Sequence, residues 1–275
     1  QEQWLFRQLS IFVGGCTLDA LEAVCASLDN ARAIQVLDGV ASLIDKSLLQ
    51  QTEVDGDEPR LVMLETLREY ALECLVASGE MEIARYAHAM YYLALTEEAE
   101  PHLTCVDQET WLQRLEREHD NLRAALNWLM EGEETKLALR LGGALQRFWL
   151  VRNHFTEGRR YLERALTQTR EVEMPVRAKA LSTASVLALH QGDYQHAADL
   201  YSESLKLFRE LGDKRGVAAS LNGLAFIGFV AGNYSEAHIW YQESLVLFRE
   251  LGDRWNIADT LFYDCLLYTS DAADD

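Results

Sequence analysis

Few side chains in this sequence stand at the spacings that catalysis or metal binding requires. Nucleophilic catalysis needs a base beside a cysteine or serine, yet the histidine nearest to Cys74 in the sequence is His88, fourteen residues away. The seven histidines are dispersed, and neither an HExxH pair nor a His/Cys cluster occurs. Cys16 and Cys25 fall on apolar helical faces, where a small buried thiol is usual. We therefore expect no catalytic residue and no metal ligand.

The sequence also lacks the residues that hold a nucleotide. A loop that cradles phosphates would need the spacing GxxxxGK[ST], which does not occur. No pair of acidic residues stands at the end of a strand pattern, where it could hold magnesium. We therefore expect that the chain binds no cofactor and is not an enzyme.

Composition and charge exclude further classes of protein. Of the 275 residues, 49% are hydrophobic, as in ordinary folded proteins. The longest apolar stretches, such as residues 224–232, are far shorter than the roughly 18 residues of a membrane span, and no secretory signal opens the chain. Five scattered cysteines favour a reducing compartment over a disulfide framework. We expect a cytoplasmic protein without a membrane partner. The formal net charge of −19 disfavours direct contact with nucleic acid.

An internal repeat is the clearest pattern in the sequence. Residues 192–213 (GDYQHAADLYSESLKLFRELGD) and 232–253 (GNYSEAHIWYQESLVLFRELGD) share 14 identical positions at an offset of 40. A period in this range indicates stacked pairs of helices. In the later copy we expect a first helix over 217–231, a turn at Gly232–Asn233, and a second helix over 234–251 that Gly252 ends in a left-handed conformation. These features resemble tetratricopeptide repeats.

The repeat pattern also predicts which faces are buried and which could bind a partner. Buried positions recur at spacings of three and four along both helices: Leu221, Leu224, Ala225 and Gly228, then Ala237, Tyr241, Ser244, Leu245 and Phe248. In tetratricopeptide stacks the first helix of each pair lines a concave groove. By position, that groove comprises Lys179, Ser182, Val186, Leu189, His190, Asn222, Phe226 and Phe229. We expect a protein, a peptide or a small inducer to bind there. The alternative is that the aromatic residues only pack against neighbouring repeats.

The N-terminal segment has a different order of elements. Apolar periodicity indicates helices near residues 4–13, 17–26 and 33–46. Gly14-Gly15 ends the first helix, and Thr17 caps the second. Two short strands over 47–54 and 60–64 flank the turn-rich sequence DGDEP, which predicts a hairpin, and residues 66–78 return to helix. Three helices followed by a hairpin are the order of a winged helix.

The charges of this segment oppose a DNA-binding role. Residues 1–78 carry five basic and thirteen acidic side chains, a net charge of −8. The helix expected at residues 33–46 has Arg32 and Lys46 at its ends but also Asp38 and Asp45, and the DGDEP wing is acidic. Because phosphates would be repelled, we expect a packing module that makes no direct contact with nucleic acid.

These observations divide the chain into four parts. We expect a winged-helix-like domain at 1–78, a helical linker at 79–134 with helices over 81–98 and 109–130 separated by Pro101, and tetratricopeptide-like repeats at 135–264. The repeats include a weaker copy at 137–166 and a further one that opens at 257–262. Residues 265–275 (CLLYTSDAADD) break the helical pattern, and we expect a non-native tail there. The overall fold class is mainly α: a small winged-helix domain with a β-hairpin, followed by an α-α superhelical array.

Four strings carry a resemblance to a known family. They are LFRQLSIFVGGCTLDALEAVC at Leu5–Cys25, VLDGVASLIDKSLL at Val36–Leu49, RLVMLETLREYALECL at Arg60–Leu75 and EHDNLRAALNW at Glu118–Trp128. In this order they resemble the region after the nucleotide-binding domain in bacterial signal-transduction ATPases of the STAND class, which combine an NB-ARC-like ATPase, a winged helix, a helical linker and tetratricopeptide repeats. Many members are LuxR-type transcriptional regulators.

The resemblance implies a regulatory role for a fragment of a longer protein. ATP or ADP would bind only to a domain upstream of Gln1, and the winged helix would pack on that domain and help to hold its inactive state. The alternatives are a scaffold whose repeats bind a partner peptide without any ATPase, and a regulator that contacts DNA through the winged helix. The inducer, the output genes and the oligomeric state do not follow from the sequence.

Overall fold

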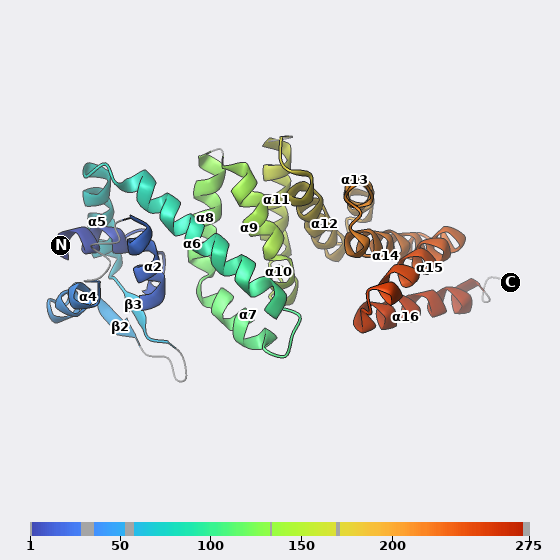
Figure 1. Ribbon diagram of the computed structural model, residues 1–275, viewed down its shortest axis with the longest axis horizontal. Helices are drawn as coiled ribbons and strands as arrows, with labels where there is room; N and C mark the ends of the chain where they lie inside the picture. The colour runs from blue at the N-terminus through green and yellow to red at the C-terminus, as the bar shows by residue number, and fades with distance from the viewer. Residues whose placement is uncertain (1, 29–35, 53–57, 133, 169–170, 272–275) are drawn as a thin grey trace. The chain divides into compact units, whose positions relative to one another are not determined.

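The computed structural model describes residues 2–28, 36–52, 58–132, 134–168 and 171–271 (Figure 1). The fold is mainly helical, with one small sheet, as predicted. Residues 1–134 and 135–275 form two compact units. No helix among the described residues is both long and apolar enough to cross a membrane.

The first unit begins with the predicted order of a winged helix. It contains α1 (Glu2–Leu9), β1 (Cys16–Thr17), α2 (Leu18–Leu28), α4 (Val36–Asp45), β2 (Gln50–Thr52), β3 (Arg60–Val62) and α5 (Glu65–Ala77). The expected start of the third helix at residues 33–35, Arg32, and positions 55–57 of the wing lie outside the described residues. The hydroxyl of Thr17 accepts a hydrogen bond from the Ala20 amide at 3.2 Å, so Thr17 caps α2 as predicted.

The predicted hairpin is present as β2 and β3, and β1 adds a third strand that the sequence did not predict. The order of the sheet is β1-β3-β2, and both pairs are antiparallel, with Leu61 opposite both Cys16 and Gln51. Gly14 and Gly15 have φ of +72° and +84°. A Cβ at Gly15 would lie 2.4 Å from the carbonyl oxygen of Leu61. The glycine pair therefore turns the chain close beside β3 and adds a strand that periodicity could not reveal.

Three further helices complete the first unit: α6 (Met81–His102), α7 (Gln108–Arg117) and α8 (His119–Glu131). Helix α6 packs against both α2 and α8. The expectation that Pro101 separates two helices was wrong in position, since α6 continues through Pro101 to His102. The helix ends one residue after this proline, and the amide of Leu103 still bonds the carbonyl of Ala99 at 3.1 Å.

The second unit is a succession of helices, each packed against its neighbours in sequence. They are α9 (Thr135–Ala144), α10 (Gln146–Val151), α11 (Phe155–Gln168), α12 (Met174–His190), α13 (Tyr194–Leu211), α14 (Lys214–Val230), α15 (Tyr234–Glu250) and α16 (Arg254–Asp271). All nine positions predicted as buried in the later repeat are buried. Gly252 has φ of +67°, in agreement with the predicted left-handed end of the second helix.

The end of the described chain requires a correction. The sequence predicted a break at Cys265, but α16 runs without interruption to Asp271 (Figure 1). Leu267 is only 4% exposed and lies in an apolar cluster with Ala237 and Tyr241 of α15. The apolar spacing from Tyr263 to Leu267 keeps this side of α16 on α15, so the helix continues. Residues 272–275 lie outside the described residues.

Candidate functional site

The predicted groove residues lie on the two first helices of neighbouring repeats. Lys179, Ser182, Val186 and Leu189 are half-buried on α12, and Asn222, Phe226 and Phe229 are half-buried on α14. His190 is exposed at the end of α12. Helices α12 and α14 are in contact. The structure therefore brings these residues onto adjacent helices, whereas their role in binding stays a prediction.

Several of these side chains already contact neighbouring helices. Asn222 donates from Nδ2 to Asp259 of α16 at 3.4 Å and accepts from the Thr260 hydroxyl at 3.3 Å. The ring of Phe226 meets Tyr263 edge-on, with centroids 5.2 Å apart. Burial raises the pKa of Asp259, while the Asn222 amide opposes that rise. The α14 part of the predicted groove is thus continuous with α16.

The α12 part of the predicted groove packs in the same manner. Val186 and Leu189 lie against the apolar cluster around Tyr201. The His190 ring stacks on Phe155 at 5.6 Å, and its Nδ1 donates to the carbonyl of Val186 at 2.8 Å. The alkyl chain of Lys179 runs close to Gly143. These contacts agree with the alternative that the residues pack between helices, and they leave their outer atoms as the surface that a partner would meet.

Sequence reasoning missed the contribution of α16 to this face. Phe262 stands 40 residues after Asn222, a predicted groove residue, so the repeat offset already contained the signal. Asp259, which accepts a hydrogen bond from Asn222, precedes Phe262 by three residues on the same helix. Phe262 is 60% exposed, and Trp255 near the start of α16 is 68% exposed. This helix therefore adds an acidic and an aromatic side chain to the face of the first helices.

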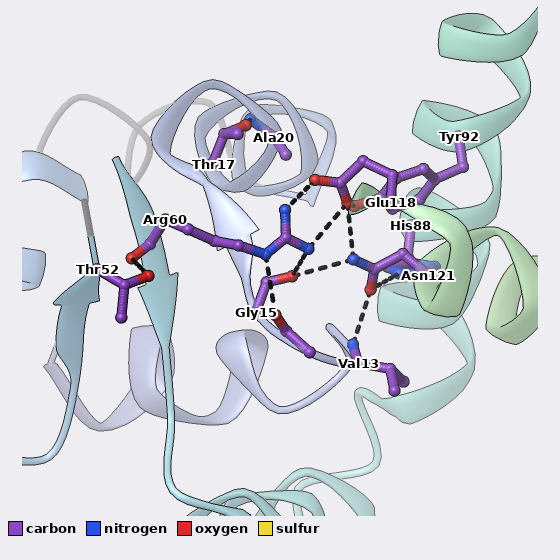
Figure 2. A network of polar contacts seen from close by, with 11 residues as sticks. Val13, Gly15, Thr17, Ala20, Thr52, Arg60, His88, Tyr92, Glu118 and Asn121 are labelled. Carbon is purple, nitrogen blue, oxygen red and sulfur yellow. Dashed lines mark hydrogen bonds and ion pairs between the residues drawn. The ribbon is translucent and has the colours of Figure 1, made fainter. Parts of the chain in front are cut away.

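A buried ion pair in the first unit was not predicted (Figure 2). Arg60 of β3 pairs with Glu118 between α7 and α8, and their side chains are only 16% and 7% exposed. Arg60 also donates to the backbone carbonyls of Gly14 at 2.9 Å and Gly15 at 2.8 Å. On the other side, Glu118 accepts from the Tyr92 hydroxyl of α6 at 2.6 Å. One carboxylate thus connects the sheet to two linker helices.

Asn121 of α8 extends this network (Figure 2). Its Nδ2 donates to Glu118 at 2.8 Å and to the carbonyl of Gly15 at 3.0 Å. Its Oδ1 accepts from the amide of Val13 at 2.7 Å and lies 3.3 Å from Nε2 of His88. Because an amide oxygen only accepts, His88 must donate from Nε2. Burial lowers the pKa of His88 to about 4, so the ring is neutral near pH 7.

No local pattern reveals this network, because Arg60 and Glu118 are 58 residues apart. The sequence showed Arg60 only as one basic residue among five. Glu118 and Asn121 stood inside the string EHDNLRAALNW without an assigned role. The structure gives them one, since they hold the winged-helix sheet against α6 and α8.

The described basic residues of the winged helix are engaged with carboxylates. Arg7 pairs with Glu80 at 2.9 Å and Arg68 with Glu65 at 2.6 Å. Lys46 pairs with Glu2, and Arg60 with Glu118. The solvent-facing positions of α4, the helix that would enter a DNA groove, are Leu37, Asp38, Ala41 and Asp45. In the part of the winged helix that the structure describes, carboxylates of the same domain and of the linker therefore neutralise the positive charges. The solvent-facing side of α4 is acidic and apolar.

Comparisons with known proteins agree with this architecture. Residues 1–76 match the model of the winged helix-turn-helix domain, and residues 176–250 match that of the tetratricopeptide repeat. This chain combines a winged helix with tetratricopeptide repeats. The winged helix contains Arg60, which pairs with Glu118 of the linker. The tetratricopeptide repeats contain the residues of the predicted groove.

Among curated relatives, proteins of Mycobacterium bovis and Mycobacterium tuberculosis named "Putative HTH-type transcriptional regulator" are 36% identical over 228 residues. The match covers 80% of this chain and 25% of each relative, so the chain spans about a quarter of their length. Among solved structures, a STAND protein with a tetratricopeptide repeat sensor from Pyrococcus horikoshii aligns with a TM-score of 0.44 and 16% identity, covering 98% of this chain and 47% of that one.

Proposed function

We propose that this chain is the regulatory and protein-interaction portion of a STAND-class signal-transduction regulator. A partner protein, a peptide or a small inducer binds to the tetratricopeptide repeats. The winged helix passes this event to a nucleotide-binding domain that is not among these 275 residues. In this proposal the chain itself catalyses no reaction and holds no cofactor, and ATP or ADP binds only to that other domain.

The observation that carries the proposal is the Arg60–Glu118 ion pair with its surroundings. A winged helix that reads DNA presents free cations to phosphates, but here the described cations of the winged helix are paired with carboxylates of the same compact unit, two of them in the linker. The sheet is instead fixed to α6 and α8 through buried contacts. Such a rigid connection suits a module that transmits a change between neighbouring parts of a protein. The relationship to proteins named as transcriptional regulators supports a regulatory setting.

The proposal is tested on the full-length gene product. We expect the complete protein to contain a P-loop and to retain ADP after purification, with a release rate that changes when Arg60 is replaced by Leu. An inducer acts as a switch only if it binds the two nucleotide states with different affinity. A complete gene without a nucleotide-binding domain would contradict the proposal and favour the scaffold in which the repeats simply bind a peptide.

DNA binding through the winged helix is the second candidate, because the relatives' printed name and the matched domain both point to it. Fluorescence anisotropy of labelled duplex DNA at low salt decides between the two. Low salt is the most sensitive condition, because it strengthens any contact with phosphate. Even there we expect the anisotropy of the DNA to stay unchanged at micromolar concentrations of this chain. Saturable binding that weakens steeply with added salt would establish the second candidate instead.

A further inference from the structure

A small pocket lies between the winged helix and the linker helices of the first unit. Its walls come from the segment after α1, from α5, from α6 and from α8. Ile11 and Leu72 supply apolar surface, and Trp128 supplies an aromatic ring. The volume is about 230 Å³. A cavity of about 150 Å³ is enough for benzene, whereas drug-sized ligands occupy roughly 300 Å³ or more. The pocket therefore suits a molecule with a single ring.

The pocket wall also includes an arginine side chain that has no hydrogen-bond or ion-pair partner among the described residues. Arg85 of α6 is half-buried and forms no hydrogen bond or ion pair with any residue that the structure describes. A partly desolvated guanidinium gains from an anion, and its planar fork matches a carboxylate in two parallel hydrogen bonds. The guanidinium thus predicts the charge and the shape of the group that would bind beside Arg85 in the pocket.

The remaining polar groups around the pocket are largely satisfied or neutral. Arg68 is bonded to Glu65 and to the carbonyl of Ser10 at 3.2 Å. His88 is uncharged near pH 7 because it is buried. Glu131 also lines the pocket, but it is exposed, so water screens its charge. Arg85 therefore dominates the local electrostatics.

The ring of Trp128 is held in a defined orientation. Its Nε1 donates to Glu82 at 3.2 Å, and its ring makes a T-shaped contact with the ring of Tyr86, with centroids 6.1 Å apart. A fixed aromatic side chain offers contact area at low cost in conformational entropy. With Leu72 and Ile11 it supplies the apolar lining of the pocket, to which Arg85 adds a cation.

We propose that this pocket binds a small aromatic carboxylate. Arg85 pairs with the carboxylate, while Trp128, Leu72 and Ile11 enclose the ring. Because α5 of the winged helix and α6 and α8 of the linker all contribute walls, the bound molecule strengthens the contact between these elements. The inference is independent of the proposed function, since it concerns ligand binding by this chain alone.

The test uses the whole chain and benzoate as the probe. We expect saturable binding in calorimetry and ligand-observed NMR, with a dissociation constant of about 1 mM or below, and a rise in the melting temperature of the first unit with benzoate concentration. The Arg85→Gln variant should bind about tenfold more weakly or not at all, because a charge-assisted bond is lost. Arg85→Lys should retain part of the affinity.

Three controls make the result decisive. Arg123→Gln removes a different guanidinium of the same unit, one that pairs with Asp120 and does not line the pocket, and it should leave benzoate binding unchanged. Benzyl alcohol lacks the charge and inorganic phosphate lacks the ring, so both should bind far more weakly than benzoate. Equal binding of phosphate, equal binding by Arg85→Gln, or no saturable binding by the native chain at about 10 mM benzoate would overturn the proposal.

Discussion

At the scale of single residues, the Arg60–Glu118 pair has the largest expected energetic effect. Arg60→Leu leaves the Glu118 carboxylate buried without its cation, and Tyr92 and Asn121 are its remaining side-chain donors among the described residues. Removing one partner of a buried pair costs about 3–5 kcal/mol. We therefore expect the free energy of unfolding of the first unit, measured with urea, to fall by that amount.

The control for this prediction is an exposed pair of the same chemistry. Arg209 and Glu243 are 52% and 44% exposed, so Arg209→Leu should cost about 1 kcal/mol or less. The double variant Arg60→Leu/Glu118→Leu removes both charges and should recover part of the loss. If Arg60→Leu is as mild as Arg209→Leu, the buried network does not hold the sheet in solution.

His88 provides a pH-dependent prediction at the same scale. Its folded pKa is about 4 and its ordinary value is 6.5, with burial as the main cause. Between these values the unfolded chain takes up a proton that the folded chain does not, so stability is lost as pH falls from 6.5 to 4. We expect His88→Gln to remove up to about 3 kcal/mol of this pH dependence. Urea unfolding of both proteins across the window measures it, and parallel pH profiles would contradict the assignment.

At the scale of elements, glycines allow the repeat helices to approach each other. A Cβ at Gly223 of α14 would lie 2.3 Å from the ring of Tyr201 on α13. Gly223→Ala should therefore destabilise the second unit by about 1–3 kcal/mol through overpacking. Gly228 of the same helix is the matched control, because its added methyl would be 3.4 Å from Ala237. Gly228→Ala should be neutral or stabilise by up to about 1 kcal/mol. Equal effects in thermal denaturation would contradict this packing.

Elements defined by local periodicity were predictable, and those defined by distant contacts were not. The second helix of the later repeat was expected over 234–251 and is found over Tyr234–Glu250. The preceding helix begins at Lys214 instead of residue 217, because the Asp213 carboxylate caps the amides of Arg215 and Gly216. Strand β1 depends on Leu61, 45 residues away from Cys16. The burial of the repeat helices followed from their periodicity, whereas the pocket at Arg85 is lined by helices from distant parts of the sequence.

At the scale of the whole molecule, two compact units predict two unfolding transitions. The repeats lie within one of these units, and contiguous parts of a structure open as separate cooperative units. In calorimetry of the intact chain, Arg60→Leu should lower the midpoint of one transition and Gly223→Ala should lower the other. For units of this size, each kcal/mol shifts a midpoint by about 4 °C, so Arg60→Leu should shift its transition by about 10 °C or more. If both variants shift the same transition, the two units unfold together and do not form separate cooperative units.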